Sequence, residues 1–471
     1  MTVEEKISVG NKYFGTDGFR GEAGVDLTSS QAYRVGRFLG WYYSSSLSGA
    51  SRRGYRPRIV IGKDTRRSSY TLEYAIASGL TASGADAYML HVTTTPSVSY
   101  VTVKDDFDCG IMITASHNRF CDNGIKVVNR YGEKLDDKTA ALVECYIDGN
   151  LSPLGIEGDI PFATGEKIGR IVDYVAGRNR YVAYLISLAS HSYKHLRIGI
   201  DCANGASWSI ASAVFGALGA RVSLIGAEPD GLNINVACGS THIEALQKLV
   251  RDQHLDVGFA FDGDCDRCIA VDERGRVVDG DGILYILAGR LKARGMLGGN
   301  TVVSTVMSNG GLARSLKDIG IASVETAVGD RFVFEEMQKG DLTLGGEQSG
   351  HIIIRKYATS GDGLLTAIML CEEMCDRKRP ISELCKGLRI YPQITKNLKV
   401  RDQNAVMSDE AVKQALCEIE ALLSGRGRVI LRKSGTEPVV RIMVECESEE
   451  DCLDYAERIA RAIEERGHLA L

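Results

Sequence analysis

Short apolar runs alternate with amphipathic stretches over most of the chain. The runs rich in Val, Ile and Leu predict strands at 58–62, 87–92, 196–202, 221–226, 256–261 and 301–306. Between them the spacing predicts helices from about Tyr70 to Ser83, up to Leu218 and up to about Gly320. This alternation predicts an α/β fold with mixed, mostly parallel sheets covered by helices.

A further helix is predicted near 241–252. It opens with Thr241 and Glu244 at the spacing of a capping box, in which each side chain bonds the backbone of the other. Two amphipathic helices, 408–423 and 448–465, flank strand-like runs near the carboxyl end and predict a small α+β domain there.

Length and composition describe an ordinary globular chain. Its 471 residues predict about three or four domains, with boundaries near 149–155, 272–280 and 389–394. The net charge of −5 gives no basic stripe for nucleic acid. We find neither an apolar leader nor a run of roughly 20 apolar residues for a membrane span, so a cytoplasmic protein is expected.

Thirteen cysteines, an odd number scattered through predicted helices and strands, argue against a disulfide framework. Cys265 and Cys268 form one C-x-x-C pair, and Cys371 and Cys375 lie four apart on a predicted helix. Structural zinc sites usually combine two such pairs in short knuckles. Buried, reduced thiols are therefore predicted.

Three aspartates alternate directly after the strand 256–261: Asp262, Asp264 and Asp266. A nearly extended loop would aim all three carboxylates one way, and carboxylates that close repel unless a cation lies between them. Hard oxygen ligands favour Mg²⁺ or Ca²⁺. A solvated acidic turn is the alternative.

An EF-hand shares the D-x-D-x-D spacing and would use Glu273 as its twelfth residue. Its sixth position needs a glycine for a sharp turn, and Arg267 stands there. Residues 268–273 also predict a strand rather than the second helix of an EF-hand. The EF-hand is therefore excluded.

A second polar stretch, "RKSGTEPVVR" (432–441), sets a tight turn of hydroxyls and glycine between two arginines. Backbone N–H groups, hydroxyls and guanidinium forks are the groups that bind phosphate oxygens. A polar hairpin with salt-bridged arginines fits the stretch equally well.

A third stretch, "LGGEQSGH" (344–351), offers Glu347, Ser349 and His351 in a glycine-rich loop. A carboxylate there could accept hydrogen bonds from two sugar hydroxyls, although a plain turn with a surface glutamate is as consistent. Near the amino end, Arg20 in "YFGTDGFRG" and the basic residues of "GKDTRRSS" (62–69) supply positive charge that could approach an anion.

Ser116 follows an apolar strand in "MITASHNRFCDNGIK" (112–126), beside His117. No G-x-S-x-G elbow surrounds it, and a serine at a strand end could simply cap a helix. A phosphoserine beside a magnesium site would unite the hydroxyl, the aspartates and the phosphate-binding loops, since phosphoryl transfer relies on positioning and charge neutralisation. We therefore predict that Ser116 carries a phosphoryl group, with His117 positioning it rather than deprotonating it.

These stretches, taken in order, resemble the α-D-phosphohexomutase superfamily across nearly the whole chain. The resemblance rests on "GTDGFRG", "TASHN…NGIK", "DGDCDR", "GEQSGH" and "RKSGTEP". It implies four domains around a central cleft, three related α/β domains and a C-terminal α+β domain resembling the TATA-binding-protein fold. The implied domains are residues 1–153, 154–276, 277–388 and 389–471.

The resemblance also implies roles for the reacting side of the site. One Mg²⁺ would be bound by an oxygen of phosphoserine 116 and by Asp262, Asp264 and Asp266. Arg20, Lys126 and Arg267 would surround the transferring phosphate. Of the two candidates for general base, we place Lys126 ahead of His351, because a lysine among arginines can have a lowered pKa.

For the rest of the ligand, the resemblance implies that Glu347 and Ser349 hold sugar hydroxyls, with His351 nearby. The phosphate that is not reacting would be held by Arg432, Ser434, Gly435, Thr436 and Arg441.

The stretches 234–242, 305–309, 327–333 and 360–367, with the glutamine of "GEQSGH", resemble the branch that acts on glucosamine phosphates. That branch interconverts glucosamine 6-phosphate and glucosamine 1-phosphate, with a hexosamine 1,6-bisphosphate as primer, and feeds UDP-N-acetylglucosamine and cell-wall precursor synthesis. The resemblance also implies a homodimer. The alternatives are an enzyme of the superfamily that prefers mannose or glucose phosphates, and a catalytically silent sugar-phosphate-binding protein.

Three residues depart from the superfamily pattern. Arg119 and Ile243 stand where proline is usual, and Cys265 replaces the second glycine of D-G-D-G-D. None of them removes a ligand, so activity is still expected. A disulfide between Cys265 and Cys268 would distort the metal loop and predicts reversible oxidative inactivation; two reduced thiols are the alternative.

Overall fold

The computed structural model describes residues 12–15, 17–45, 55–424, 427–433 and 439–470. The described chain divides into two compact units. One lies within residues 1–307 and 323–386, and the other within 308–322 and 387–471.

The first unit begins with a seven-stranded mixed sheet in the order β1-β2-β6-β5-β3-β4-β7. Strand β3 pairs in parallel with β4 and with the central strand β5, while β6 pairs antiparallel with β5 and β2. The strands are β1 (Phe14–Gly15), β2 (Gly18–Glu22), β3 (Arg58–Lys63), β4 (Asp86–Val92), β5 (Cys109–Ile113), β6 (Asp122–Asn129) and β7 (Ile171–Asp173).

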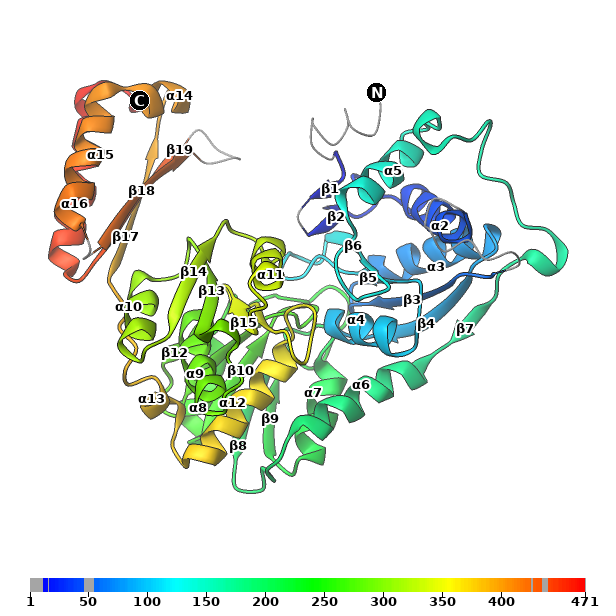
Figure 1. Ribbon diagram of the computed structural model, residues 1–471, viewed down its shortest axis with the longest axis horizontal. Coiled ribbons are helices and arrows are strands. Elements are labelled where there is room, and N and C mark those ends of the chain that lie inside the picture. Colours follow the sequence, from blue (N-terminus) through cyan, green and yellow to red (C-terminus); the bar gives the residue numbers. More distant parts are fainter. Residues whose placement is uncertain (1–11, 16, 46–54, 425–426, 434–438, 471) are drawn as a thin grey trace. The chain divides into compact units, whose positions relative to one another are not determined.

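Helices cover both faces of this sheet because alternate residues of a strand point to opposite sides (Figure 1). Ile59 and Ile61 of β3 belong to one core with helices α2 (Ser29–Ser44), α3 (Arg67–Ala82) and α5 (Asp137–Ile147). Val60, between them, packs on the other side in a core with helix α4 (Thr95–Lys104).

Two smaller mixed sheets complete the first unit, in the orders β12-β11-β10-β8-β9 and β14-β13-β15-β16. Their strands are β8 (Arg197–Asp201), β9 (Arg221–Ile225), β10 (Val257–Phe261), β11 (Cys268–Asp272), β12 (Val277–Val278), β13 (Thr301–Thr305), β14 (Ala322–Thr326), β15 (Leu344–Gly346) and β16 (Ile352–Ile354). The helices are α6 (Val175–Leu188), α7 (Trp208–Ala217), α8 (Glu244–Gln253), α9 (Gly280–Ala293), α11 (Asp330–Lys339), α12 (Gly363–Arg377) and α13 (Ile381–Leu384).

The second unit is built on an antiparallel sheet in the order β17-β19-β18, with helices α15 and α16 side by side along it (Figure 1). Its elements are α10 (Gly310–Asp318), β17 (Gln393–Lys399), α14 (Gln403–Ser408), α15 (Glu410–Leu423), β18 (Gly427–Lys433), β19 (Val439–Cys446) and α16 (Glu449–Glu465). Within this unit, Asn309 ties the start of α10 to Tyr391, which precedes β17. In the described chain, no helix is both long enough and apolar enough to cross a bilayer.

The predicted strands and the α+β character of the C-terminal part are confirmed. The capping box at Thr241 is wrong: α8 begins at Glu244, its N-cap residue is Ile243, and no side-chain capping bond is found in the described part of the chain. The preceding stretch is held as a turn instead, because the Ser240 N–H donates to Phe261 O at 2.9 Å and the His242 N–H to Gly239 O at 3.0 Å. Strand β7 follows the predicted boundary at 153, yet it pairs with β4 in the first sheet.

Helices α2 and α3 touch through their backbones at two glycines. A Cβ on Gly36 would lie 2.2 Å from the Ile76 carbonyl oxygen, and one on Gly79 would lie 2.2 Å from that of Tyr33. Backbone atoms cannot move aside as a flexible side chain can. These two helices can therefore cross this closely only because glycine has no side chain at either position.

Replacing Gly36 by alanine should destabilise the protein although alanine is the better helix former. We expect the free energy of unfolding to fall by about 1–3 kcal/mol, the usual cost of overpacking, against a helix-propensity gain of about 1 kcal/mol. Gly289→Ala in α9 is the matched control, since no described atom outside the backbone of α9 lies within 4 Å of its added Cβ. Urea unfolding should show the control equal to or more stable than the wild type; equal midpoints for both variants would contradict the packing argument.

Candidate active site

The structure brings Ser116 against the three aspartates. Ser116 lies after β5, and the aspartates lie between β10 and β11, in the loops beyond the carboxyl ends of parallel-paired strands where α/β folds gather ligands. Ser116 Oγ donates a hydrogen bond to Asp262 Oδ2 at 2.5 Å, and both side chains are buried. Residues 146 positions apart in the chain thus form one site.

Ser116 itself has a left-handed backbone, with φ 51°. A non-glycine residue in this region is uncommon and often marks a functional site. Its N–H donates to Thr114 Oγ1 at 2.9 Å, and the Asn118 N–H donates to Ala115 O at 3.0 Å, so the loop is a closed turn. The turn leads into strand β6, not a helix, and the alternative of a helix-capping serine is wrong.

His117 lies beside the hydroxyl, with its Nδ1 3.3 Å from Ser116 Oγ. Burial, together with the charges of Arg267 and Arg20, lowers the pKa of His117 to about 4. The imidazole is therefore neutral near pH 7 and a weak base.

The aspartate cluster forms through a turn, and the expected extended loop is wrong. The Cys265 N–H donates to the Asp262 carbonyl oxygen at 3.1 Å, and Cys265 has φ 61°. One carboxylate oxygen from each of Asp262, Asp264 and Asp266 lies within 4.8 Å of the others. A turn converges the carboxylates where an extended strand would have set them side by side.

These carboxylates suit a divalent cation. Asp264 Oδ1 and Asp266 Oδ1 are buried and accept no hydrogen bond from the described residues. Burial and the charges of Asp266 and Asp264 raise the pKa of Asp262 well above its usual range. A hard cation such as Mg²⁺ would coordinate the oxygens that accept no hydrogen bond and would relieve the repulsion.

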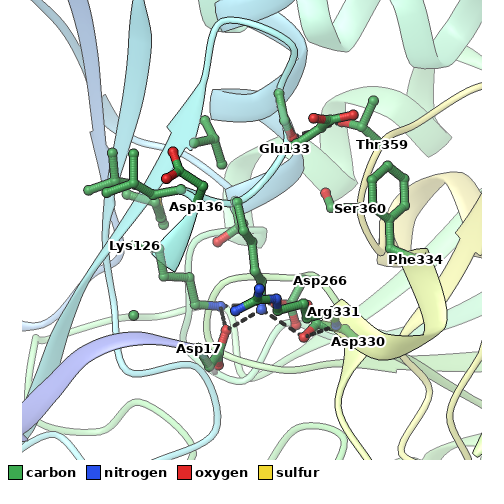
Figure 2. A pocket seen from close by; sticks show the side chains of 18 of the residues that line it. Asp17, Lys126, Glu133, Asp136, Asp266, Asp330, Arg331, Phe334, Thr359 and Ser360 are labelled. Carbon is green, nitrogen blue, oxygen red and sulfur yellow. Dashed lines mark hydrogen bonds and ion pairs between the residues drawn. The ribbon is translucent and has the colours of Figure 1, made fainter. Parts of the chain in front are cut away.

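Lys126, from β6, supplies the nearest positive charge. Its Nζ lies 2.8 Å from Asp264 Oδ2, 3.0 Å from Asp266 Oδ2 and 3.4 Å from Asp17 Oδ1, and Figure 2 shows the amine extending toward Asp17. Burial alone would lower the pKa of this amine, but the three carboxylates raise it well above its usual value. The expected lowering of the Lys126 pKa is wrong because carboxylates, not arginines, surround the amine.

Arg20 and Arg267 approach the same cluster. Arg20 pairs with Asp17, and the Arg267 backbone N–H donates to Asp262 Oδ1 at 3.2 Å. The Nε atoms of both arginines are buried and donate no hydrogen bond to the described residues. Arg267 Nε lies 3.9 Å from Asp266 Oδ1, beyond hydrogen-bond distance. Guanidinium N–H groups that donate no hydrogen bond are what a bound anion would satisfy.

His351 lies in the loop between β15 and β16. The Gly361 N–H donates to His351 Nε2 at 3.0 Å, while His351 Nδ1 lies 3.7 Å from Asp266 Oδ1. Burial alone would lower the pKa of His351, but Asp266 and Asp330 raise it to about 9. His351 Nε2 also lies 3.6 Å from Asp330 Oδ2.

The other members of this loop differ in exposure. Glu347 is half-buried and its Oε1 accepts the Gly329 N–H at 3.1 Å, whereas Ser349 is exposed. Lys126, Asp266 and His351 also line a cavity of about 240 Å³, with Asp330 and Ser360 on its wall (Figure 2).

Sequence reasoning missed several residues of the site. Thr95 Oγ1 donates to Asp264 Oδ2 at 2.5 Å, and Lys134 bridges Asp17 and Asp330 at 3.3 and 2.7 Å. Asp17 stands in the same "FGTDGFRG" stretch as Arg20, so its motif could have pointed to it. Thr95 and Lys134 carry no such signal.

The basic residues of 62–69 do not supply free charge for an anion. Lys63 and Arg66 are buried and pair with Glu73 and Asp64, respectively. The expectation that this stretch brings positive charge to a ligand is therefore wrong for these two residues.

The stretch 432–441, in which a phosphate site is predicted, belongs to the second unit. Arg432 and Arg441 are cross-strand partners of β18 and β19. The predicted residues Ser434, Gly435 and Thr436 lie outside the described residues.

The cysteines are free thiols, as predicted. Cys265 and Cys268 are buried, and burial raises the pKa of both thiols. Because the thiolate is the form that oxidises, the structure favours two reduced thiols over a ready disulfide switch.

Within the described chain, the three aspartates form the one group of three or more His, Cys, Asp or Glu side chains that lie close enough to share a metal ion.

Comparison with known proteins agrees with this geometry. Models of the phosphoglucomutase/phosphomannomutase family match in order: α/β/α domain I over residues 11–152, domain II over 179–275, domain III over 279–391 and the C-terminal domain over 396–462. The chain belongs to the phosphoglucomutase/phosphomannomutase family. This confirms the superfamily and the four-domain α/β fold expected from the sequence.

Relatives within the phosphoglucomutase/phosphomannomutase family cover nearly the whole chain. A phosphoglucosamine mutase from Lachnospira eligens is 55% identical over 457 residues, 97% of this chain and 99% of that protein. A family protein from Burkholderia thailandensis has the same fold, with a TM-score of 0.77 at 23% identity over 97% of each chain. So does an Aspergillus fumigatus N-acetylphosphoglucosamine mutase solved with GlcNAc-6P and magnesium, with a TM-score of 0.65 at 18% identity over 99% of each.

Removing one carboxylate should abolish stabilisation by magnesium. Wild-type protein at a Mg²⁺ concentration 100 times Kd should gain about 2.7 kcal/mol of stability, seen as a rise in melting temperature. Asp264→Asn should lose this rise, because a neutral amide binds Mg²⁺ poorly. Asp454→Asn, at an exposed site on α16, is the control and should keep it. An Asp264→Asn protein that still responds to Mg²⁺ like the wild type would refute the assigned metal site.

Asp362 is a buried carboxylic acid that caps the start of α12. Its Oδ1 accepts the Leu365 N–H and its Oδ2 accepts the Tyr181 hydroxyl, both at 2.9 Å. Burial raises the pKa of Asp362 to about 6. The folded state therefore binds the proton more tightly than the unfolded chain, and stability falls as pH rises from about 4 to 6.

Asp362→Asn should remove that fall. An asparagine can accept from Leu365 and donate to the tyrosine oxygen, so the variant should be more stable than the wild type at pH 8, by at most about 3 kcal/mol. The difference should vanish toward pH 4. Denaturant titrations at both pH values measure it, with Asp402→Asn, an exposed cap of α14, as control. A variant equal to wild type at pH 8 would show that the buried carboxylate carries no such cost.

Proposed function

We propose that this protein is a phosphoglucosamine mutase. It interconverts glucosamine 6-phosphate and glucosamine 1-phosphate through a phosphoserine at Ser116 and a glucosamine 1,6-bisphosphate intermediate, and so supplies UDP-N-acetylglucosamine and cell-wall precursor synthesis. The observation that carries the chemistry is the 2.5 Å hydrogen bond from Ser116 Oγ to Asp262 in the buried aspartate cluster.

In this proposal Ser116 carries the phosphoryl group, and Asp262, Asp264 and Asp266 hold Mg²⁺ beside it. The bound Mg²⁺ would neutralise charge on the phosphoryl oxygens. Arg20, Lys126 and Arg267 offer positive charge to the same group. The Nε atoms of Arg20 and Arg267 donate no hydrogen bond to the described residues, which supports their part. Transfer then depends on holding donor and acceptor in line rather than on a strong base.

The sugar preference rests on the relatives. The protein from Lachnospira eligens is named a phosphoglucosamine mutase and matches this chain almost end to end. We propose that Glu347 and Ser349 hold the sugar hydroxyls, since Glu347 is fixed by Gly329 at the loop that also presents His351. Arg432, Ser434, Gly435, Thr436 and Arg441 would hold the phosphate that is not reacting.

Lys126 and His351 stay the two candidates for general base, and His117 is proposed to position Ser116. The four segments 1–153, 154–276, 277–388 and 389–471 stay the proposed domains, with β7 added to the sheet of the first. The cytoplasmic location and the homodimer expected from the sequence stay predictions.

Substrate competition tests the proposal most directly. We would measure kcat/KM for glucosamine 6-phosphate, glucose 6-phosphate and mannose 6-phosphate, with Mg²⁺ and a trace of hexose 1,6-bisphosphate. A preference for the amino sugar above about tenfold, or roughly 1.4 kcal/mol of transition-state binding, is expected. Ser116→Ala should be inactive with every sugar because it cannot carry the phosphoryl group.

Other outcomes separate the alternatives. Preference for glucose or mannose phosphate would keep the phosphoserine chemistry and overturn the assigned substrate. No turnover of any sugar by a protein shown to carry phosphate on Ser116 would favour a sugar-phosphate-binding protein instead.

A further inference from the structure

Two side chains from different parts of the chain grip the backbone of the Ser116 loop. Asn235 Nδ2 donates to the carbonyl oxygens of Ser116 and Asn118 at 2.8 and 2.9 Å. Arg66 Nη2 donates to the same two oxygens at 3.2 and 2.7 Å. The two carbonyls, which flank His117 in the sequence, thus each accept one hydrogen bond from a neutral amide and one from a charged guanidinium.

Both donors are held in place by bonds of their own. Arg66 is fully buried and its Nη1 pairs with Asp64. Its backbone N–H also donates to Asp64 Oδ1 at 3.0 Å. Asp64 also accepts the Ser69 hydroxyl at 2.8 Å. The guanidinium is therefore fixed before it meets the loop, and its charge is balanced within α3 and the turn before it.

Asn235 comes from the "INVACGSTH" stretch, which the proposed function leaves without a role. It is 8% exposed and has φ 59°, and its N–H donates to Ala203 O at 2.9 Å. Asp201 fixes that neighbourhood by accepting the N–H groups of Ala203 and Gly239 at 2.9 and 2.8 Å. The amide is aimed at the Ser116 loop by a rigid second loop.

The metal loop packs against the same carbonyl. A Cβ added to Gly263 would lie 2.6 Å from Ser116 O and 3.2 Å from Asn235 Nδ2. Glycine at this position lets the backbone between Asp262 and Asp264 lie directly on the gripped carbonyl. A shift of the Ser116 carbonyl would therefore also shift its hydroxyl relative to Asp262.

We propose that Asn235 and Arg66 are positioning residues that hold Ser116 in its left-handed conformation and aim its Oγ at the aspartates. This inference rests on the proposed function, in which Ser116 carries the phosphoryl group. A left-handed serine is strained and persists only where surrounding bonds impose it. A phosphoserine also adds negative charge that would push the loop away from nearby carboxylates. Four hydrogen bonds to two carbonyls oppose both tendencies.

The test replaces the donor amide without changing its shape. Asn235→Asp puts a carboxylate oxygen where Nδ2 was, facing the carbonyl oxygens of Ser116 and Asn118. We expect kcat for glucosamine 6-phosphate to fall about 10–100-fold, the size of effect that a misplaced reacting group causes, while KM changes by less than about threefold. Hydrogen exchange should speed up at the amides of Ser116 and Asn118, which are bonded within the loop.

Asn233→Asp is the matched control in the same loop. Among the described residues its side chain bonds only within the turn 228–233: Asn233 Nδ2 donates to Glu228 O at 2.9 Å, and Asn233 Oδ1 accepts the Asp230 N–H at 3.0 Å. This variant should keep wild-type kcat and wild-type exchange over 114–118. Should Asn235→Asp fail to fold, Asn235→Ala, which leaves Arg66 alone on the carbonyls, should show the same changes to a smaller degree.

Wild-type exchange over 114–118 in a folded Asn235 variant would overturn the proposal, as would a rise in KM with kcat unchanged. The exchange measurement does not depend on catalysis. Faster exchange in Asn235→Asp, with no turnover of any hexose phosphate by the wild type, would overturn the proposed function and leave the hold on Ser116 established.

Discussion

The contact of Ser116 with a buried cluster of three aspartates is the constraint on which the rest of the site depends. Carboxylates whose oxygens lie within 4.8 Å of one another repel strongly in a buried setting. The fold offsets this with Lys126, with the Thr95 hydroxyl and with the Arg267 backbone N–H. Asp264 Oδ1 and Asp266 Oδ1 nevertheless accept no hydrogen bond from the described residues. In a structural ion-pair network the protein's own donors satisfy the carboxylate oxygens. Here two oxygens accept no hydrogen bond within the described chain, which is the arrangement expected of a cation site.

The same contact dictates the local backbone. To bring its hydroxyl to Asp262, Ser116 adopts a left-handed conformation, and Cys265 does so within the aspartate turn. Gly263 must lack a side chain because the Ser116 carbonyl occupies that space. These conformations are unfavourable singly, and the hydrogen bonds of Arg66 and Asn235 hold the serine loop against them. The hydrogen bonds that hold the Ser116 loop are therefore a consequence of the contact between Ser116 and the charge cluster.

The sequence predicted the chemistry of the site better than its geometry. The D-x-D-x-D spacing predicted a cluster of hard oxygen ligands, and the strand pattern placed it after β10, because both depend on local residue order. It did not predict the turn that converges the carboxylates, since a two-residue period suits an extended loop as well. The environment of Lys126 was also out of reach, because Asp17 joins it from another loop. Likewise, the sequence predicted that Arg66 offers its charge to an anion, whereas in the structure Arg66 is buried and pairs with Asp64. Long-range contacts decide such roles, and a single sequence does not show them.

Cys265 shows how the aspartate turn accommodates a side chain where the sequence resemblance implies a glycine. Glycine adopts a left-handed backbone freely, whereas a side chain there costs about 1 kcal/mol or more. The cysteine at φ 61° is held from both sides: its N–H donates to Asp262 O at 3.1 Å, and its carbonyl accepts the Gly363 N–H at 3.0 Å. Its side chain is fully buried, so the apolar surface of the thiol offsets part of the backbone strain. The carboxylates on either side of it still converge. The hydrogen bonds of the aspartate turn therefore set its geometry, and the turn can form without a glycine at position 265.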